Sequence, residues 1–249
     1  MIDIFAKPLG ALLRMIFDFV TNIGLETEYI SAYAIAIILT TIIFKLILLP
    51  LGIKQSKSMK KMQDIQPKVK EIQEKYKNDP QKQQAKTMEL YKEHNANPFG
   101  SCLPLLIQMP ILIGFFRVLR NPAPIFEAGE MISKGYVFQD ATLYEQLNKS
   151  FLWISNLKDP DPVLWGLPLL AAITTFLQSR IMSSKSAGGD EKAQQTQKTM
   201  NMVFPVLILI MSRSFPAGLA LYWVIGNIFT IVQQLITNRT MGGVKEESS

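Results

Sequence analysis

Long apolar runs alternate with charged blocks along this chain of 249 residues. The first complete run covers residues 29–53, about 25 residues, which is long enough for a helix to cross a bilayer core. Its single charge is Lys45, roughly eight residues from the end that leads into a lysine-rich segment. A cation at that depth is costly unless it faces protein or water. Lys45 therefore indicates either a functional site or a side chain that snorkels to the interface.

Four further apolar runs predict four more spans, at residues 97–120, 162–182, 199–212 and 215–237. The run at 199–212 gives a helix of only about 21 Å, against a hydrocarbon core of about 30 Å. Either this helix borrows polar residues from the preceding loop, or the bilayer thins around it.

Residues 1–28 show apolar positions at helical spacing, with Lys7, Arg14 and Asp18 off that face. The apolar face consists of Leu9, Leu12, Leu13, Ile16, Phe17 and Val20. This pattern predicts an amphipathic helix that lies in the membrane interface on the outer side. A short span is the alternative, and the brief uninterrupted apolar length argues against it.

The charged block at residues 54–96 has apolar residues at every third or fourth position, and this pattern is broken at Asn78-Asp79-Pro80. It predicts an antiparallel helical hairpin. Pro50 and Gly52 lie just before the hairpin, at its root. Its eleven lysines and six acidic residues give a net charge of +5, which places it in the cytoplasm. It is either a solvated topology anchor or a docking surface. The candidate docking residues are Lys57, Lys60, Lys61, Lys68 and Lys70.

Charge also orients the other connections. Residues 121–161 are polar, with six acidic residues and only three lysines, and are expected outside, with the stretch 151–157 at the interface. The loop at 183–198 and the tail at 238–249 are expected in the cytoplasm. We therefore expect an all-α membrane protein with its N-terminus outside and its C-terminus inside. Five transmembrane helices surround a polar groove, accompanied by a cytoplasmic helical hairpin and an N-terminal interfacial amphipathic helix.

Composition narrows the chemistry. Cys102 and His94 are the only residues of their kinds, which argues against a metal site, a cofactor or a histidine-based triad. There is also no Gly-x-Ser-x-Gly, His-Glu-x-x-His or glycine-rich phosphate loop, so no enzymatic activity is expected.

Polar residues follow single stripes on four of the spans. Trp223, Asn227, Thr230 and Gln234 lie on one face of the last span, with Tyr222 beside them. Elsewhere the pairs are Thr41 with Lys45, Ser101 with Gln108, and Thr174 with Gln178. Each residue alone is more typical of helix-to-helix hydrogen bonding, but together with a cation they favour a hydrated cavity. The candidate groove residues are Thr41, Lys45, Gln108, Thr174, Gln178, Tyr222, Trp223 and Asn227.

Three long motifs resemble one family: MQDIQPKVKEIQEKYKND (62–79), NPFGSCLPLLIQMPI (97–111) and FPAGLALYWVIGNIFTIVQQ (215–234) look like segments of the YidC/Oxa/Alb membrane protein insertases, in the five-span Gram-positive form. The resemblance covers about residues 40–238. It implies a groove, open to the cytoplasm and to lipid, that receives hydrophilic parts of nascent membrane proteins. Bacterial members hold an arginine where Lys45 stands here, so the charge is kept without the bidentate geometry of a guanidinium.

The function implied is that of a membrane protein insertase and chaperone in the bacterial plasma membrane, which releases apolar helices sideways into the bilayer. Its partners would be nascent membrane proteins, lipid and the ribosome, and no specific nucleic-acid sequence is expected. Whether a Sec translocon is also a partner is left open. The alternative is a small channel or solute transporter with a polar intramembrane cavity. Against it, the spans hold no acidic residue for a proton or sodium site, and no paired broken helices are visible.

Overall fold

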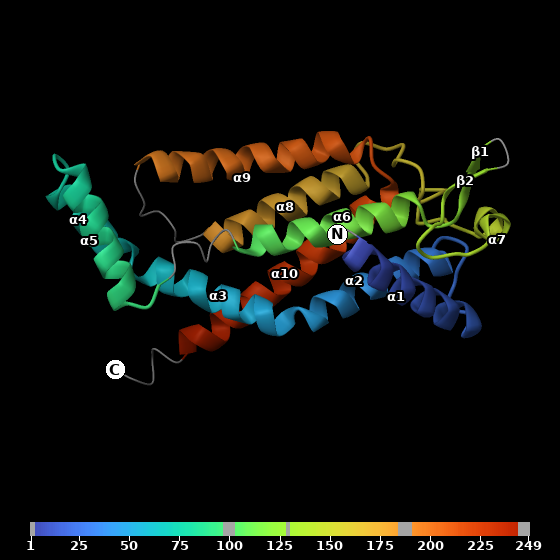
Figure 1. Ribbon diagram of the computed structural model, residues 1–249, viewed down its shortest axis with the longest axis horizontal. Coiled ribbons are helices and arrows are strands. Elements are labelled where there is room, and N and C mark those ends of the chain that lie inside the picture. Colours follow the sequence, from blue (N-terminus) through green and yellow to red (C-terminus); the bar gives the residue numbers. More distant parts are fainter. Residues whose placement is uncertain (1–2, 97–102, 128–129, 184–190, 244–249) are drawn as a thin grey trace. The chain divides into compact units, whose positions relative to one another are not determined.

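The computed structural model describes residues 3–96, 103–127, 130–183 and 191–243. Helices dominate this part of the chain, as the apolar periodicity predicts (Figure 1). They are α1 (Asp3–Asn22), α2 (Ala32–Ile47), α3 (Leu49–Asp64), α4 (Gln66–Lys75), α5 (Pro80–Glu93), α6 (Leu103–Arg120), α7 (Ala141–Gln146), α8 (Leu167–Ser183), α9 (Glu191–Ser212) and α10 (Ala217–Gly243). Strands β1 (Ile125–Glu127) and β2 (Glu130–Ser133) form a small antiparallel hairpin.

The chain forms two compact units. The first comprises Met1–Ile47, Ile107–Thr175 and Pro205–Phe229, and the second comprises Leu48–Leu106, Phe176–Phe204 and Thr230–Ser249. Several long helices contribute residues to both units, so each unit is described by itself below.

One described helix, Ala217–Thr240, is by itself long and apolar enough to cross a membrane. The helical stretches Ala32–Ile47 and Leu49–Lys75 meet the same criterion only when taken together as a bent pair. The helices Leu167–Met182 and Asn201–Ser212 are apolar but shorter. The structure thus accounts for one or two spans by length and composition, and the count of five remains a prediction.

Helix α1 has the apolar face that the sequence predicts. Leu9, Leu13 and Phe17 are buried on it, and the Phe17 ring packs edge-on against Phe138, 5.2 Å between centroids. Gly10 lies so close to the loop that contains Tyr136 that an added Cβ would collide with the backbone carbonyl oxygen of Tyr136. The buried face of α1 therefore contacts protein, since α1 packs mainly on α2.

The first apolar run breaks earlier than its sequence suggests. Helix α2 ends at Ile47 and α3 begins at Leu49, whereas Pro50 and Gly52 were expected to end the span and form a root for the hairpin. Proline is tolerated in the first turn of a helix, so Pro50 does not interrupt α3. Gly52 lies within α3, against α10, where an added Cβ would come within 2.5 Å of the amide nitrogen of Gln233.

Helices α4 and α5 form the predicted antiparallel hairpin, with its turn at the predicted place (Figure 1). The Asp79 side chain accepts a hydrogen bond from the Lys82 backbone at 3.0 Å and caps α5, and Pro80 occupies its first turn. Lys68 and His94 join the two helices, 3.0 Å between Nζ and Nε2. Residues 54–64, which were assigned to the hairpin, belong instead to α3.

The two C-terminal helices are longer than the runs that predicted them. Helix α9 is already helical over 191–198, which corrects the loop expected at 183–198, so the short apolar run does borrow polar residues. Helix α10 continues past residue 237 into the expected tail. Its described part extends to Gly243.

A buried carboxylate starts α8. Asp161, 6% exposed, accepts hydrogen bonds from the Trp153 indole at 3.0 Å and from the Leu167 backbone at 2.8 Å. The span expected to begin at residue 162 therefore becomes helical only at Leu167, because Asp161 holds the preceding loop at the helix N-terminus.

Candidate functional site

Lys45 of α2 reaches polar partners on two other helices. Its ammonium donates to Oε1 of Gln108 on α6 at 3.4 Å, and the Gln108 amide donates to the Tyr222 hydroxyl on α10 at 2.7 Å. The Lys45 stem also lies over Gly226, where an added Cβ would sit 3.4 Å from the lysine Cε. We call Lys45, Gln108, Tyr222 and Gly226 the Lys45 cluster. It places a cation among three helices in the first unit.

Aromatic packing holds this cluster in position. The ring of Phe115 stacks on that of Tyr222 with centroids 4.0 Å apart and planes inclined by 20°. Phe44, the residue before Lys45, meets Phe115 edge-on at 6.4 Å. Both Phe115 and Tyr222 are almost completely buried, so the Tyr222 hydroxyl has a fixed direction toward Gln108.

A second polar group joins α8 to α10. The Trp223 indole donates to Oγ1 of Thr175 at 2.8 Å, and the Asn227 amide donates to Oγ1 of Thr174 at 3.1 Å and of Thr175 at 3.0 Å. The two threonine hydroxyls donate in turn to backbone carbonyls one turn earlier in α8. These four residues, the Thr175 cluster, have the hydrogen bonding typical of helices that associate inside a membrane.

The structure thus divides the candidate groove residues into groups. Lys45, Gln108 and Tyr222 share one cluster, and Thr174, Trp223 and Asn227 share the other. The Thr41 hydroxyl, which is buried, donates to the Ile37 carbonyl of its own helix at 2.7 Å. Gln178 belongs to the second unit, where its amide lies 3.8 Å from Sδ of Met182, and Ser101 lies outside the described residues.

Two members of these clusters were missed by sequence reasoning. Thr175 accepts from both Trp223 and Asn227, although only Thr174 shares the four-residue spacing with Gln178. Gly226 has no polar side chain that could have marked it as a site residue. Only its position four residues after Tyr222, on the same helix face, could have indicated that it belongs to the Lys45 cluster.

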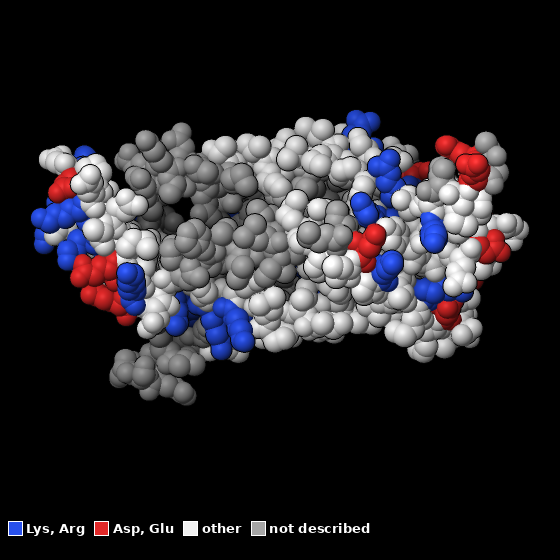
Figure 2. All heavy atoms as spheres, viewed as in Figure 1, with Lys and Arg blue, Asp and Glu red and all other residues white. Residues whose placement is uncertain are grey.

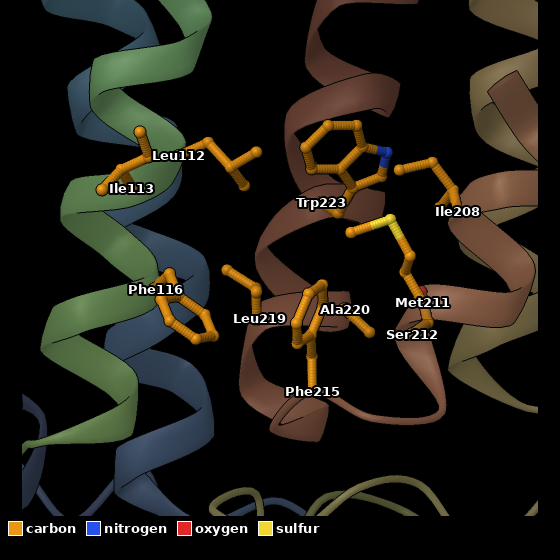
Figure 3. A pocket seen from close by; sticks show the side chains of 10 residues that line it. All are labelled: Leu112, Ile113, Phe116, Ile208, Met211, Ser212, Phe215, Leu219, Ala220 and Trp223. Atoms are coloured by element: carbon orange, nitrogen blue, oxygen red, sulfur yellow. The ribbon is translucent and has the colours of Figure 1, made fainter.

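An apolar pocket of about 220 Å³ lies beside the Trp223 ring (Figure 3). Helices α6, α9 and α10 and the turn before α10 all contribute to it. Its lining residues are Leu112, Ile113, Phe116, Ile208, Met211, Ser212, Phe215, Leu219, Ala220 and Trp223. Trp223 therefore has its ring edge in an apolar space and its indole N–H on Thr175.

The candidate docking lysines are distributed over two helices of the second unit. Lys57, Lys60 and Lys61 lie on α3, and Lys68 and Lys70 on α4. All are exposed except Lys60, which is half-buried. Within the described ranges, no group of three or more His, Cys, Asp or Glu side chains is arranged to hold a metal ion.

Comparison with known proteins places the chain in a family. Residues 25–245 match the family model described as 60Kd inner membrane protein. The chain is 41% identical over 232 residues to the membrane protein insertase YidC of Clostridium perfringens, covering 91% of this chain and 88% of that protein. It is 40% identical to the YidC of Fusobacterium nucleatum (90% and 93% covered) and 41% identical to YidC 1 of Listeria monocytogenes (88% and 68% covered). The chain therefore belongs to the 60Kd inner membrane protein family, together with these YidC membrane protein insertases.

Proposed function

We propose that this protein is a bacterial plasma-membrane insertase that receives hydrophilic parts of nascent membrane proteins around the Lys45 cluster. The observation that carries the proposal is the meeting of a lysine from α2, a glutamine from α6 and a tyrosine from α10 in one hydrogen-bonded cluster. A cation in a membrane helix is costly unless it faces protein or water, and for that reason it is treated as a functional site by default. Similar proteins are named membrane protein insertases, and membrane protein insertion is a process in which polar groups must enter the membrane.

The mechanism we propose is catalysed partition without covalent chemistry. A hydrated groove near Lys45 lowers the cost of bringing a polar segment into the membrane, and the ammonium attracts acidic groups of that segment. The coulombic attraction is modest, about 4 kcal/mol at 4 Å for an effective dielectric near 20. The substrate is therefore held loosely enough to move on.

The apolar pocket beside Trp223 gives the substrate's apolar helix a place to go. It is lined by α6, α9 and α10 and has almost wholly apolar walls, so it suits an aliphatic or aromatic side chain. We propose that apolar helices pass this face on their way into lipid. In this scheme the chain has five spans with its N-terminus outside, and the lysines of α3 and α4 contact a ribosome or another cytoplasmic partner.

Photocrosslinking tests the proposal directly. A photoreactive residue at Trp223, in the pocket, should crosslink to the nascent membrane protein of a stalled ribosome complex. The matched control is Ile228 on the same helix, which is 45% exposed and about 140° around it. Equal crosslinking from both positions, or none from Trp223, would count against a defined path. Flux of a small solute through the purified protein would favour a channel instead.

A further inference from the structure

Helix α3 has two chemically different faces. Ser56 and Met59 are buried on one side, together with the close contact at Gly52. Lys54, Lys57 and Lys61 are exposed and fall on the opposite side, within about 60° of one another at 100° per residue. We call these three residues the α3 lysine face.

The contacts of α3 with α10 fix the level of this face. The Ser56 hydroxyl donates to Oε1 of Gln234 at 2.7 Å, and both side chains are buried within the second unit. Beside Gln234 on α10, the side chains of Leu235 and Ile236 are 48% and 58% exposed and apolar. Both residues lie in Ala217–Thr240, the helix that is long and apolar enough to cross a membrane, so we place their side chains in lipid. The level of Ser56 therefore lies within reach of the hydrocarbon edge.

Lys54 and Lys57 flank Ser56, so they lie at this edge on the side turned away from the protein. Lys61 follows seven residues after Lys54, about 10 Å along the helix. One polar layer of a bilayer is some 5–8 Å thick, from the difference between its total and hydrocarbon thickness. The α3 lysine face thus extends through one such layer and just beyond it.

We propose that the α3 lysine face binds the phosphate headgroups of anionic phospholipids. Charge favours lipid here, because α3 holds one acidic residue, Asp64, whereas α4 and α5 mix both signs. Figure 2 shows Lys and Arg over the segment labelled α3 in Figure 1, and blue and red side by side over α4 and α5. This assignment does not depend on the proposed insertase mechanism. It removes the α3 lysines from the proposed docking surface and leaves Lys68 and Lys70 to contact a soluble partner.

Hydrogen exchange in nanodiscs tests the assignment. We expect α3 amides of the full chain to exchange at least about fivefold more slowly in discs containing phosphatidylglycerol than in phosphatidylcholine discs, because about 1 kcal/mol from a single lysine at an anionic surface already corresponds to about fivefold. The difference should shrink at high salt. It should vanish in the triple variant Lys54→Gln, Lys57→Gln, Lys61→Gln and persist when the same three residues are changed to Arg.

The matched control removes the same charge from the hairpin by Lys68→Gln, Lys70→Gln and Lys77→Gln, and it should keep the full lipid response. Unchanged exchange of α10 amides in each variant shows that the fold is retained. Equal α3 exchange in both kinds of disc, or a lipid response that survives the triple Gln change on α3, overturns the proposal. Protection of α3 by added ribosomes but not by phosphatidylglycerol would assign the face to ribosomal RNA instead.

Discussion

The ammonium of Lys45 lies 3.4 Å from Oε1 of Gln108, which connects the one charged side chain of α2 to α6. This separation is longer than the 2.7–3.2 Å of a typical N–H···O bond, so the contact is weak. A substrate carboxylate would form a stronger, charge-assisted bond with the same ammonium. The geometry thus suits a cation that exchanges an internal partner for a passing acidic group.

Gly226 offers a graded test of the space around Lys45. An alanine Cβ would sit 3.4 Å from the lysine Cε, an ordinary contact, so Gly226→Ala should leave insertion near the wild-type rate. Gly226→Leu places three more carbons there and should displace the ammonium, reducing insertion several-fold. Insertion rates of a substrate with an acidic tail distinguish the two. If the leucine variant inserts the substrate as fast as the alanine variant, the space around Lys45 is large enough for the leucine side chain, and close packing at Gly226 does not position the ammonium.

The Thr175 cluster should act as a stabilising contact between α8 and α10. Asn227→Leu and Thr175→Val each remove hydrogen bonds inside the membrane segment, and buried bonds of this kind contribute about 0.6–1.7 kcal/mol. We expect each variant to lower the unfolding temperature in detergent, and the double variant to lose less than the sum. Strict additivity would show that the two residues do not interact.

Asp161 should be important for the start of α8. Asp161→Ala removes the acceptor for the Trp153 indole and for two backbone N–H groups, those of Val163 and Leu167, and leaves these donors buried or half-buried. Loss of such a cap costs about 1–2 kcal/mol, and unpaired donors add to it. Thermal unfolding measures the loss. Asp161→Asn keeps one acceptor oxygen and should fall between wild type and alanine; an alanine variant as stable as wild type would contradict the cap.

Much of this organisation was readable from the sequence, and the errors have physical causes. The hairpin turn at Asp79-Pro80 and the apolar face of α1 follow from local capping and periodicity, so both were predicted. That face was expected in the membrane interface, whereas it packs against α2. The break at Leu48 lies just before Pro50, which has no N–H for the preceding helical turn, so the proline acts a few residues earlier than expected. Gly52 instead serves close packing against Gln233. The spacing of residues along one helix cannot predict such long-range contacts. For the same reason it could not predict that Thr174 and Lys45 belong to two different clusters.

The attachment of α1 should depend on pH through Asp3. The Tyr136 hydroxyl donates to its carboxylate at 2.7 Å and, with help from Arg117, lowers the pKa of Asp3 below its ordinary value of 3.8. A lowered carboxyl pKa in the folded state stabilises it above the ordinary pKa, and this stabilisation is lost as the pH falls through the folded value. Asp3 is exposed, so the effect is small.

We expect protection factors of α1 amides to stay level from pH 7 to about pH 5 and to decrease as the pH falls below the ordinary carboxyl pKa of 3.8. Tyr136→Phe, which removes the main cause of the shift, should flatten that dependence, and Asp3→Asn should remove this contribution. A Tyr136→Phe profile that overlays the wild-type profile would show that the hydrogen bond does not anchor α1.

The central claim is that Lys45 attracts acidic groups of the substrate, and matched insertion assays in cells depleted of their own insertase test it most directly. Lys45→Arg, Lys45→Ala and Lys45→Glu are compared on two substrates that differ only in an acidic or a neutral translocated tail. We expect arginine to retain insertion of both, and alanine and glutamate to reduce insertion of the acidic substrate more than that of the neutral one. Equal activity of Lys45→Ala and wild type on both substrates would contradict the account and show that the lysine merely reaches toward the membrane surface.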